Sequence, residues 1–583
     1  MPRLAPSGVP LIPGILEWGI LAAIMLLAFT MIRSAGSRRG LELMPWPDGL
    51  EYAASAVNLA AGRGAVLHFG GYTYPSRYTG GYPLLLEFFY RVRGPDFVFF
   101  YASTFFGMIS VFFVFMLARA YFGRAVATIA ALTLALSPVF ITYSSLVMSD
   151  VPTLFVTVYA AMMLVVATSN YVSQLPSWTR MSAWLIFGLF AGFSTIIRPT
   201  NVVILVGLML CVLMVPLERR DLRNLLSAGV AVALGFAIPV AWQLHQNSIN
   251  LGSAFASGYS WWVPEVYGAG GKTFSIAYLF GPTMPRNPHG NVIVYATTLL
   301  GLDGMLGDPG DARYFLYPFA AAAFAIVGFI AILRAPERSA ARRLMWFGLG
   351  YLAALTGLYC FYVFTDVAFI LPGAFVLFIA AGCGAGAANR YMRQVFKNPN
   401  RKPYKLASAA SVIVLDLLLV VSLASEVGAR LNAAPENSTM VASLEEQDST
   451  LPPDATIVSN ISLQFLDLYL GETRSYVGLN SMDPGERFTD YHLHRLYEKR
   501  AAGWSGPVPP VVFDGEQMSA SAADSIASAI DAKKPVFLIL AAPESQQYAD
   551  VLKGELDQMQ AKFAITPVSQ NEAIAVYRLS PHD

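Results

Sequence analysis

Long apolar runs separated by short polar segments fill the first 428 or so residues of the chain. An α-helix needs about 20 apolar residues to cross a hydrocarbon core about 30 Å thick, so the pattern predicts an all-α polytopic membrane domain with about 11 transmembrane helices. Two of the runs are short and are separated only by Arg198-Pro199-Thr200, which predicts a tight hairpin. The expected helices lie near residues 11–32, 97–118, 125–145, 151–168, 183–197, 200–215, 226–244, 314–333, 344–364, 367–388 and 406–427.

The pattern changes over residues 429–583, where charged residues and Pro/Gly punctuation increase and the apolar runs shorten to strand length. Alternating strand-length and helix-length runs are typical of an α/β arrangement, so we expect a C-terminal soluble α/β domain with a mostly parallel sheet. The expected strands are 456–459, 475–478, 511–513, 536–540 and 574–577, and the expected helices are 461–470, 484–500, 519–532 and 544–561.

The composition supports a membrane protein. The chain has 583 residues, 55% hydrophobic and 13% charged, with a mean hydropathy of +0.51, whereas soluble globular domains carry roughly 25% charged residues. A formal net charge of +1 gives no reason to expect a nucleic-acid partner. Cys211, Cys360 and Cys383 lie in apolar runs without metal-ligand spacing, so we expect them to be small buried residues.

Lys and Arg distribution predicts the orientation, because short basic loops stay cytoplasmic. Four basic clusters fall on one side if the N-terminus is cytoplasmic, and only the basic residues near 33–39 do not fit. We therefore expect a multi-pass protein of the cytoplasmic (plasma) membrane whose first loop (about 33–96), long loop (about 245–313) and C-terminal domain are extracytoplasmic. The clusters are Arg119/Arg124, Arg219/Arg220/Arg223, Arg334/Arg338/Arg342/Arg343 and residues 390–405.

Two carboxylates, Asp48 and Asp150, are expected at the outer membrane surface, where a charge beside hydrocarbon is costly and suggests a function. Asp48 suits a general base. A structural alternative has equal weight: Asp48 precedes a helical pattern and would cap it, and Asp150 precedes Val151-Pro152 at a helix start. Arg77 and Arg198 are candidates to bind phosphate through bidentate donors, or to snorkel to the interface.

Weaker candidates are aromatic and basic residues of the expected outer loops. The aromatic residues are able to stack on a sugar, and an interfacial aromatic belt explains them equally well. Glu17 and Asp416 lie in apolar runs but are too few to indicate an ion path, and His492 and His494 are expected to be a surface pair. The loop candidates are Tyr52, Tyr72, Tyr74, Tyr78, Tyr82, Trp261, Trp262, Lys272, Arg286 and His289.

The first-loop residues form a pattern: Pro47-Asp48-Gly49, then Tyr52, then Tyr74-Pro75-Ser76-Arg77-Tyr78-Thr79-Gly80-Gly81-Tyr82-Pro83. This pattern resembles the first extracytoplasmic loop of the C-class (GT-C) integral membrane glycosyltransferases, in particular the bacterial protein O-mannosyltransferase and aminoarabinose lipid A transferase group. Met148-Ser149-Asp150-Val151-Pro152 resembles the second acidic motif of that group, and Gly188 to Arg198-Pro199-Thr200 resembles its glycine-rich hairpin.

The resemblance implies a catalytic role for Asp48, a second acidic site residue at Asp150, and donors that are polyprenyl-phosphate sugars. It implies no certain cofactor, and family members differ on whether a divalent metal takes part. One departure concerns the late loop, where the family commonly has Asp-x-Arg-Tyr before Leu-Pro. Here the sequence is Asp366-Val-Ala-Phe-Ile-Leu-Pro372, so the arginine is missing.

The leading interpretation is a membrane glycosyltransferase that moves a sugar from a polyprenyl-phosphate carrier to an extracytoplasmic lipid, glycan or protein acceptor. Asp48 is the expected base, and Arg77 and Arg198 are expected near the phosphate. The residues expected to bind substrate are Tyr52, Tyr74, Tyr78, Tyr82 and His289. A transporter or lipid flippase remains an alternative, but its charges are expected near the bilayer midplane. A non-catalytic envelope assembly protein is a third hypothesis, and it leaves the first-loop motif unexplained.

Overall fold

The computed structural model groups the chain into two compact units. The helical unit comprises Met1–Gly36, Phe100–Leu244 and Lys272–Ala434, and the mixed unit comprises Ser37–Phe99, His245–Gly271 and Pro435–Asp583. The structure describes residues 14–37, 48–69, 72–94, 102–168, 177–213, 222–262, 267, 272–283, 288–302, 316–334, 340–397, 403–432, 440–471, 473–479, 481, 520–542, 546–571 and 573–582.

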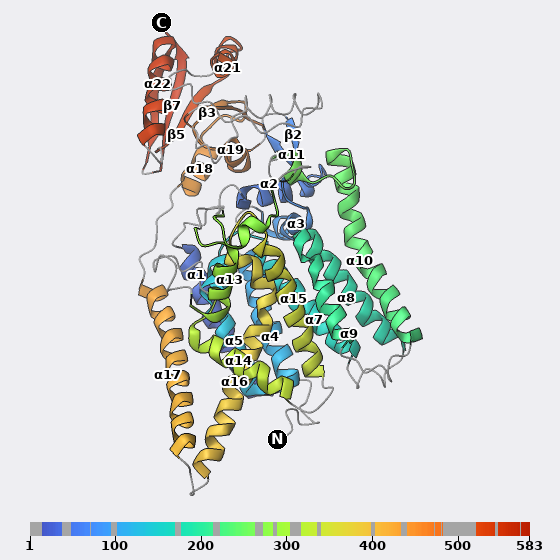
Figure 1. The fold of residues 1–583 in the computed structure, drawn as a ribbon. Coiled ribbons are helices and arrows are strands. Elements are labelled where there is room, and N and C mark those ends of the chain that lie inside the picture. Colours follow the sequence, from blue (N-terminus) through green and yellow to red (C-terminus); the bar gives the residue numbers. More distant parts are fainter. Residues whose placement is uncertain are drawn as a thin grey trace. The chain divides into compact units, whose positions relative to one another are not determined.

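Each apolar run predicted from the sequence falls on helical structure in the helical unit (Figure 1). Among the described residues, six helices are long and apolar enough to cross a membrane: α1, α4, α7, α8, α10 and α16. The pair α5 and α6 is bent by 62° and makes a seventh candidate if it counts as one span. The described parts of α9, α13, α14 and α17 form shorter apolar helices, so the structure gives six or seven candidate spans where the sequence predicted about 11.

The helical elements have the following bounds: α1 Ile15–Ser37, α4 Ala102–Phe122, α5 Arg124–Ala135, α6 Pro138–Ser144, α7 Asp150–Thr168, α8 Ser177–Ile197, η3 Pro199–Val203, α9 Ile204–Leu213, α10 Leu222–Leu251, η5 Ile276–Leu279, α13 Asn291–Leu300, α14 Phe319–Arg334, α15 Ala340–Cys360, η8 Val367–Ile370, α16 Leu371–Lys397 and α17 Pro403–Asn432.

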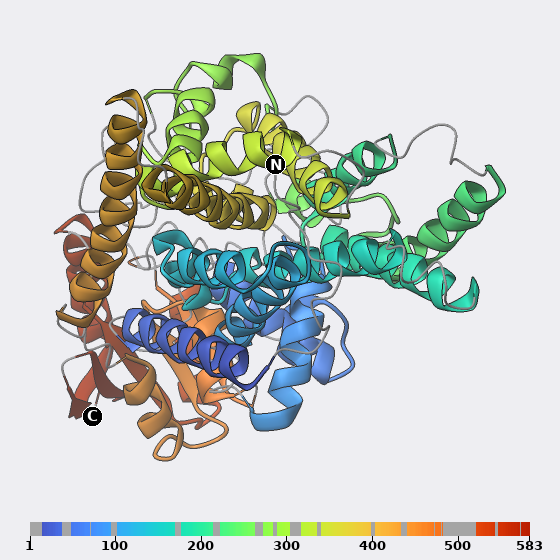
Figure 2. The ribbon, with the colours of Figure 1, turned by 90° about the horizontal axis from the view of Figure 1, so that it is seen from below.

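Glycines allow the helices of this unit to approach closely. A Cβ atom on Gly328 of α14 would lie 1.9 Å from the carbonyl oxygen of Ala380, and one on Gly384 of α16 would lie 1.8 Å from that of Phe324. Small residues at such positions permit backbone contact between membrane helices. α16 therefore packs along α14, while α17, which also packs on α14 and α16, lies at the edge of the unit (Figure 1 and Figure 2).

The mixed unit combines the first loop with the C-terminal part of the chain. Its first-loop elements are α2 (Asp48–Ala60), the antiparallel strands β1 (Val66–Phe69) and β2 (Tyr72–Pro75), and α3 (Gly81–Arg93), and α11 (Gly258–Trp262) follows from the long loop. The C-terminal elements are α18 Met440–Asp448, β3 Thr456–Ser459, α19 Leu463–Leu470, β4 Ser475–Gly478, α21 Ala520–Asp531, β5 Val536–Ala541, α22 Gln546–Lys562, β6 Phe563–Gln570 and β7 Ile574–Pro581.

The five-stranded sheet has the order β4-β3-β5-β7-β6 and is mixed rather than mostly parallel. β3 pairs in parallel with β4 and β5, whereas β7 is antiparallel to both β5 and β6. The short connection from β6 to β7 requires an antiparallel pair. The sequence prediction missed β6 because this strand contains Pro567, which a sheet tolerates at an edge, and has an exposed polar end. The expected strand 511–513 and helix 484–500 lie outside the described residues.

α19 joins the first loop to the C-terminal region within one core. This short helix packs against α18 and β4 and also against α2 and β1 of the first loop. Leu463, Phe465 and Leu466 are fully buried, and the rings of Phe465 and Tyr469 lie 4.7 Å apart. The helix that carries Asp48 is therefore supported by residues more than 400 positions later in the chain.

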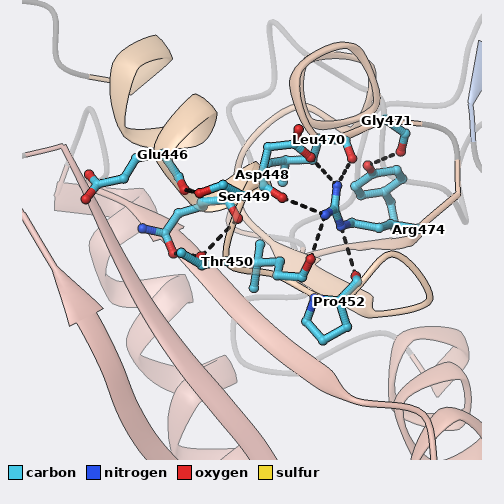
Figure 3. Close-up of polar contacts among 11 residues, drawn as sticks. Glu446, Asp448, Ser449, Thr450, Pro452, Leu470, Gly471 and Arg474 are labelled. Atoms are coloured by element: carbon cyan, nitrogen blue, oxygen red, sulfur yellow. Dashed lines mark hydrogen bonds and ion pairs between the residues drawn. The ribbon is translucent and has the colours of Figure 1, made fainter.

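Arg474 fixes the ends of α18 and α19 (Figure 3). Its Nη1 lies 2.5 Å from Asp448 Oδ1 and also donates to the carbonyl oxygen of Leu470. Nε donates to the carbonyl oxygen of Pro452, and Nη2 donates to those of Asp448 and Leu451, at 3.1, 3.0 and 2.7 Å. This buried guanidinium thus satisfies carbonyls that the helix termini leave without intrahelical partners.

Candidate active site

The first acidic cluster lies in the mixed unit and consists of Asp48, Glu51, Arg77 and Tyr78. Asp48 and Glu51 are three residues apart on α2, so both face the same side of the helix. Glu51 Oε1 accepts hydrogen bonds from Arg77 Nε at 2.6 Å and pairs with Nη2 at 2.5 Å. The next residue, Tyr78, donates its hydroxyl to Asp48 Oδ1. The two acids of one helical turn therefore hold two consecutive residues that follow β2.

Burial sets the charges of this cluster. Burial raises the pKa of the fully buried Glu51, and the positive charge of Arg77 opposes that rise. Burial also works against the charge of Arg77, yet the Glu51 carboxylate keeps the pKa of Arg77 above its ordinary value. Burial and the nearby Asp48 raise the pKa of Tyr78, so its hydroxyl stays protonated and donates to Asp48. Asp48 itself is only partly buried.

Tyrosine rings pack around the first acidic cluster. The rings of Tyr52 and Tyr78 lie 4.4 Å apart, Tyr52 and Tyr82 4.9 Å, and Tyr78 and Tyr259 5.5 Å. Tyr52, Tyr74 and Tyr82 are buried, whereas Tyr78 and Tyr259 are partly exposed. The buried rings support the cluster from within, and the rings that reach the surface are Tyr78 and Tyr259.

Gly258 allows the long loop to approach the first loop beside Tyr78. A Cβ atom at this position would lie 1.9 Å from the carbonyl oxygen of Ser76, so a larger residue would force the two backbones apart. The neighbouring residue, Tyr259, then places its ring edge against Tyr78. The sequence analysis did not predict this contact.

The second acidic cluster lies in the helical unit, where Asp150 begins α7 and Arg198 lies between α8 and η3. Arg198 Nη1 donates to Asp150 Oδ1 at 2.7 Å, and the guanidinium lies 4.9 Å from the ring centre of Phe369. Asp150 is fully buried, and its Oδ2 has no hydrogen-bond partner among the described residues. The Asp366 carboxylate accepts hydrogen bonds from the Tyr143 hydroxyl and, at 2.8 Å, from the backbone N–H of Ala368.

Asn291, at the start of α13, fixes the segment that leads to Asp366. Its Nδ2 donates to the carbonyl oxygens of Tyr359 and Tyr362 at 3.0 and 2.7 Å, and its Oδ1 accepts from the Thr365 hydroxyl. One turn later on α13, Tyr295 donates its hydroxyl to the carbonyl oxygen of Asp366 at 3.2 Å. The fully buried Asn291 therefore donates to carbonyl oxygens at the end of α15. The last carbonyls of a helix have no N–H partner within the helix.

The structure places the remaining predicted site residues as follows. His289 and Lys272 are exposed in the helical unit, and the side chain of Trp261 in the mixed unit is partly exposed. Glu17 forms an ion pair with Arg119 at 2.8 Å, so it has a structural partner. Arg286, His492 and His494 lie outside the described residues. No group of three or more metal-binding side chains occurs in the part of the chain that the structure describes.

Sequence reasoning missed Glu51, Tyr143 and Asn291 as members of these clusters. Glu51 had a local signal, since it stands one helical turn after Asp48. Tyr143 and Asn291 reach their partners across 223 and 68 or more positions of sequence, respectively, so no local pattern indicates them. Arg77 and Arg198 are each paired with a carboxylate in the structure.

The chain is similar to one protein family in sequence and to several solved structures in fold. Residues 81–242 match the family model described as dolichyl-phosphate-mannose-protein mannosyltransferase. This match bears out the predicted resemblance to the C-class membrane glycosyltransferases over that part of the chain, and the protein is a multi-pass integral membrane protein. No curated protein sequence matches the chain.

Solved structures with a similar fold include ArnT from Cupriavidus metallidurans bound to undecaprenyl phosphate, with a TM-score of 0.58 and 14% identity over 97% of this chain and 98% of that chain. The archaeal oligosaccharyltransferase AglB from Archaeoglobus fulgidus, in complex with an inhibitory peptide and a dolichol-phosphate, has a TM-score of 0.52 and 12% identity over 97% and 74%. The arabinofuranosyltransferase AftD from Mycobacteria has a TM-score of 0.51 and 12% identity over 98% and 42%.

Proposed function

We propose that the protein transfers a sugar from a polyprenyl-phosphate donor to an extracytoplasmic acceptor, with Asp48 as the general base. The observation that carries the proposal is the partly exposed Asp48 carboxylate, held by the Tyr78 hydroxyl on a helix that other elements pack on several sides. A carboxylate fixed in this way is oriented to accept a proton and remains accessible to an acceptor. ArnT and AglB were solved with polyprenyl phosphates, which supports this donor class.

In the proposed reaction the acceptor nucleophile loses its proton to Asp48 and attacks the anomeric carbon of the donor sugar. The bond between that carbon and the phosphate oxygen breaks with inversion, and the polyprenyl phosphate leaves with the electron pair. We assign donor-phosphate binding to Arg77 and Arg198, because guanidinium groups stabilise the charge that develops on a departing phosphate. Asp150 orients Arg198 through the 2.7 Å ion pair, and Tyr78 contacts the substrate.

The late loop supports the assignment of Arg198. The family commonly has an arginine two positions after the acid, and this chain has Ala368 there. Arg198 stacks on Phe369, the next residue, and so places a guanidinium beside the loop that lacks one. We propose that Arg198 supplies the cation there.

We also propose that α9, α14, α15 and α17 cross the bilayer together with the seven candidate spans, which gives about 11 spans with the N-terminus cytoplasmic and residues 429–583 extracytoplasmic.

The test is transfer of radiolabelled sugar from a panel of polyprenyl-phosphate donors by protein reconstituted in lipid, comparing wild type with Asp48→Asn and Arg198→Gln. We expect transfer by the wild type, a loss of at least 100-fold in kcat for Asp48→Asn, and a weaker donor interaction for Arg198→Gln. A variant at the exposed His582, whose Nε2 contacts the carbonyl oxygen of Gln560, is the control that retains activity. Full transfer by a well-folded Asp48→Asn protein would remove Asp48 from the mechanism.

A further inference from the structure

Four large apolar side chains are exposed on two segments of the helical unit whose backbones pair, and we call them the apolar patch. Phe274, Ile276 and Phe280 are 49, 77 and 69% exposed, and Phe361 is 41% exposed. η5, which contains Ile276, lies between the two phenylalanines at 274 and 280. Burial of apolar surface is favourable in proportion to the area removed from water, so four such residues exposed together indicate a surface that binds an apolar partner.

The backbone beneath this apolar patch is fixed. The N–H of Ser275 donates to the carbonyl oxygen of Phe361 at 2.8 Å, and the N–H of Val363 donates to that of Thr273 at 3.0 Å. Phe274 and Tyr362 form an antiparallel bridge, and their rings lie 5.4 Å apart. The two segments that carry the exposed side chains are therefore fixed to each other by backbone pairing, and Phe361 stands five residues before Asp366 in the chain.

The charge and composition of the segment indicate the kind of partner. Residues 272–283 contain one cation, the exposed Lys272, and no acid. Tyr278 donates its hydroxyl to the backbone carbonyl oxygen of Lys272 at 2.9 Å, so an aromatic residue is tied to the backbone of the residue that carries the cation. Aromatic and aliphatic side chains next to a lysine, without acids, are typical of segments in the interfacial region of a bilayer that contains anionic lipids.

Neighbouring structure continues the apolar surface. α13 follows this segment, and it exposes Ile293 and Leu300 at 38 and 42%. A Cβ atom on Gly290 would lie 2.5 Å from the Cα atom of Phe280, so the segment packs directly on the start of α13. An apolar surface shared by a loop and a helix of a membrane-spanning unit favours lipid over a polypeptide partner.

We propose that the apolar patch of Phe274, Ile276, Phe280 and Phe361 lies in the boundary between headgroups and acyl chains, with Lys272 paired to anionic headgroups. Because Thr273 and Ser275 are hydrogen-bonded to Val363 and Phe361, the bilayer then holds one side of the segment that leads to Asp366. This inference does not depend on the proposed transfer reaction, since it concerns where the segment lies and not what the protein catalyses.

Site-directed fluorescence tests the proposal in the full-length protein. An Ile276→Cys variant, made in a Cys360→Ala background, is labelled with the environment-sensitive fluorophore NBD and reconstituted in phosphatidylcholine and phosphatidylglycerol bilayers with or without nitroxide-labelled lipids. The matched control is Val568→Cys in β6, an apolar residue of the C-terminal sheet that is 53% exposed. We expect nitroxide lipids to quench the label at residue 276 at least twofold and to leave the label at residue 568 nearly unchanged.

Each outcome decides the proposal. Equal and weak quenching at residues 276 and 568 would overturn it, and Phe280→Cys provides a second position if Ile276→Cys reduces expression. Quenching by lipid at residue 276 that weakens when Lys272→Ala is added supports the headgroup contact. A label at residue 276 that nitroxide lipids do not quench, and whose emission moves to shorter wavelength only when a polyprenyl phosphate is added, would overturn the bilayer contact. It would instead assign the patch to the isoprenoid chain of the donor.

Discussion

The Glu51–Arg77 ion pair provides a quantitative test of the first acidic cluster. The perturbation is Glu51→Gln, which keeps the shape of the side chain and removes the charge that faces Arg77. Glu51 is fully buried and the Arg77 side chain is 20% exposed, so water reaches the guanidinium only partly after the substitution. Breaking a buried pair by removing one partner typically costs 3–5 kcal/mol. We expect about 3 kcal/mol here, at the lower end, because of that partial exposure.

Hydrogen exchange of α2 measures this cost without requiring the whole membrane protein to unfold reversibly. A loss of about 3 kcal/mol in the free energy of opening corresponds to exchange roughly 100-fold faster, since each 1.4 kcal/mol is tenfold. Arg77→Met alone should give a similar increase, because it leaves the Glu51 carboxylate buried without its cation. The double variant Glu51→Leu with Arg77→Met should exchange more slowly than either single variant, since an apolar pair can replace a buried ion pair.

The double variant also separates stability from chemistry. If Arg77 binds the donor phosphate as proposed, the double variant should recover the protection of α2 and still transfer sugar poorly. Additive effects of the two single substitutions on exchange would refute the reasoning, because residues that share an ion pair must show a coupling energy. Recovery of full transfer together with α2 protection would limit Arg77 to a structural role.

Three further predictions concern pH, the late loop and loop docking. In Arg77→Met the cation that opposes burial is gone, so the pKa of Glu51 rises further above its unfolded value. The stability that protonated Glu51 contributes is then fully present below its unfolded pKa of about 4.3 and is lost as the pH rises through the raised pKa of the folded state. After correction for the intrinsic exchange rates of the amides, α2 should therefore exchange more slowly at pH 5 than at pH 8. Asn291→Leu should lower transfer at least tenfold and speed exchange over residues 359–366, because one buried and one partly buried carbonyl lose their donor, at up to about 1–3 kcal/mol each. Gly258→Ala should lower kcat/KM and speed exchange at residues 76–78, because its Cβ atom meets the Ser76 carbonyl oxygen.

Controls and contrary outcomes are available for each. Exchange of α2 in Arg77→Met that is independent of pH would contradict the burial of an ionised Glu51. For the late loop the control is Thr297→Ala, which removes hydrogen bonds that Thr297 makes only within α13. Transfer by Asn291→Leu equal to that of the control would show that the hydrogen bonds of Asn291 are dispensable for transfer. Gly229→Ala, with no atom within 4 Å of its new Cβ, should be neutral, and an equal effect of both glycine variants would exclude loop docking as the cause.

The sequence predicts elements whose signals are local. The eleven apolar runs fall on helices, and the strands at 456–459, 475–478, 536–540 and 574–577 are confirmed, because periodicity and run length are properties of neighbouring residues. The number of membrane crossings follows less directly, since several helices are shorter than their apolar runs. The mixed sheet was not predicted, because the direction of β7 follows from its short connection to β6, and β6 was not recognised as a strand because it contains Pro567.

Partner choice within the two acidic clusters was beyond the sequence for a different reason. The residues were prominent individually, but the pairs Glu51–Arg77, Asp150–Arg198 and Tyr143–Asp366 are 26, 48 and 223 positions apart. Non-local pairing depends on how helices pack, which side-chain patterns do not specify. From the sequence alone, a basic residue near an expected outer surface was therefore as consistent with binding a phosphate as with pairing to a carboxylate of the protein.

The contact of α19 with α2 and β1 imposes an order on the biogenesis of the protein. About 400 residues of chain separate the end of α2 from the start of α19. At synthesis rates of roughly 5–20 residues per second, the first loop waits some 20–80 s after emerging before the helix that completes its core exists. During that interval the ribosome and the translocation machinery hold a nascent chain whose Asp48 helix lacks its final neighbours, so maturation of this loop is necessarily a late, post-insertion event.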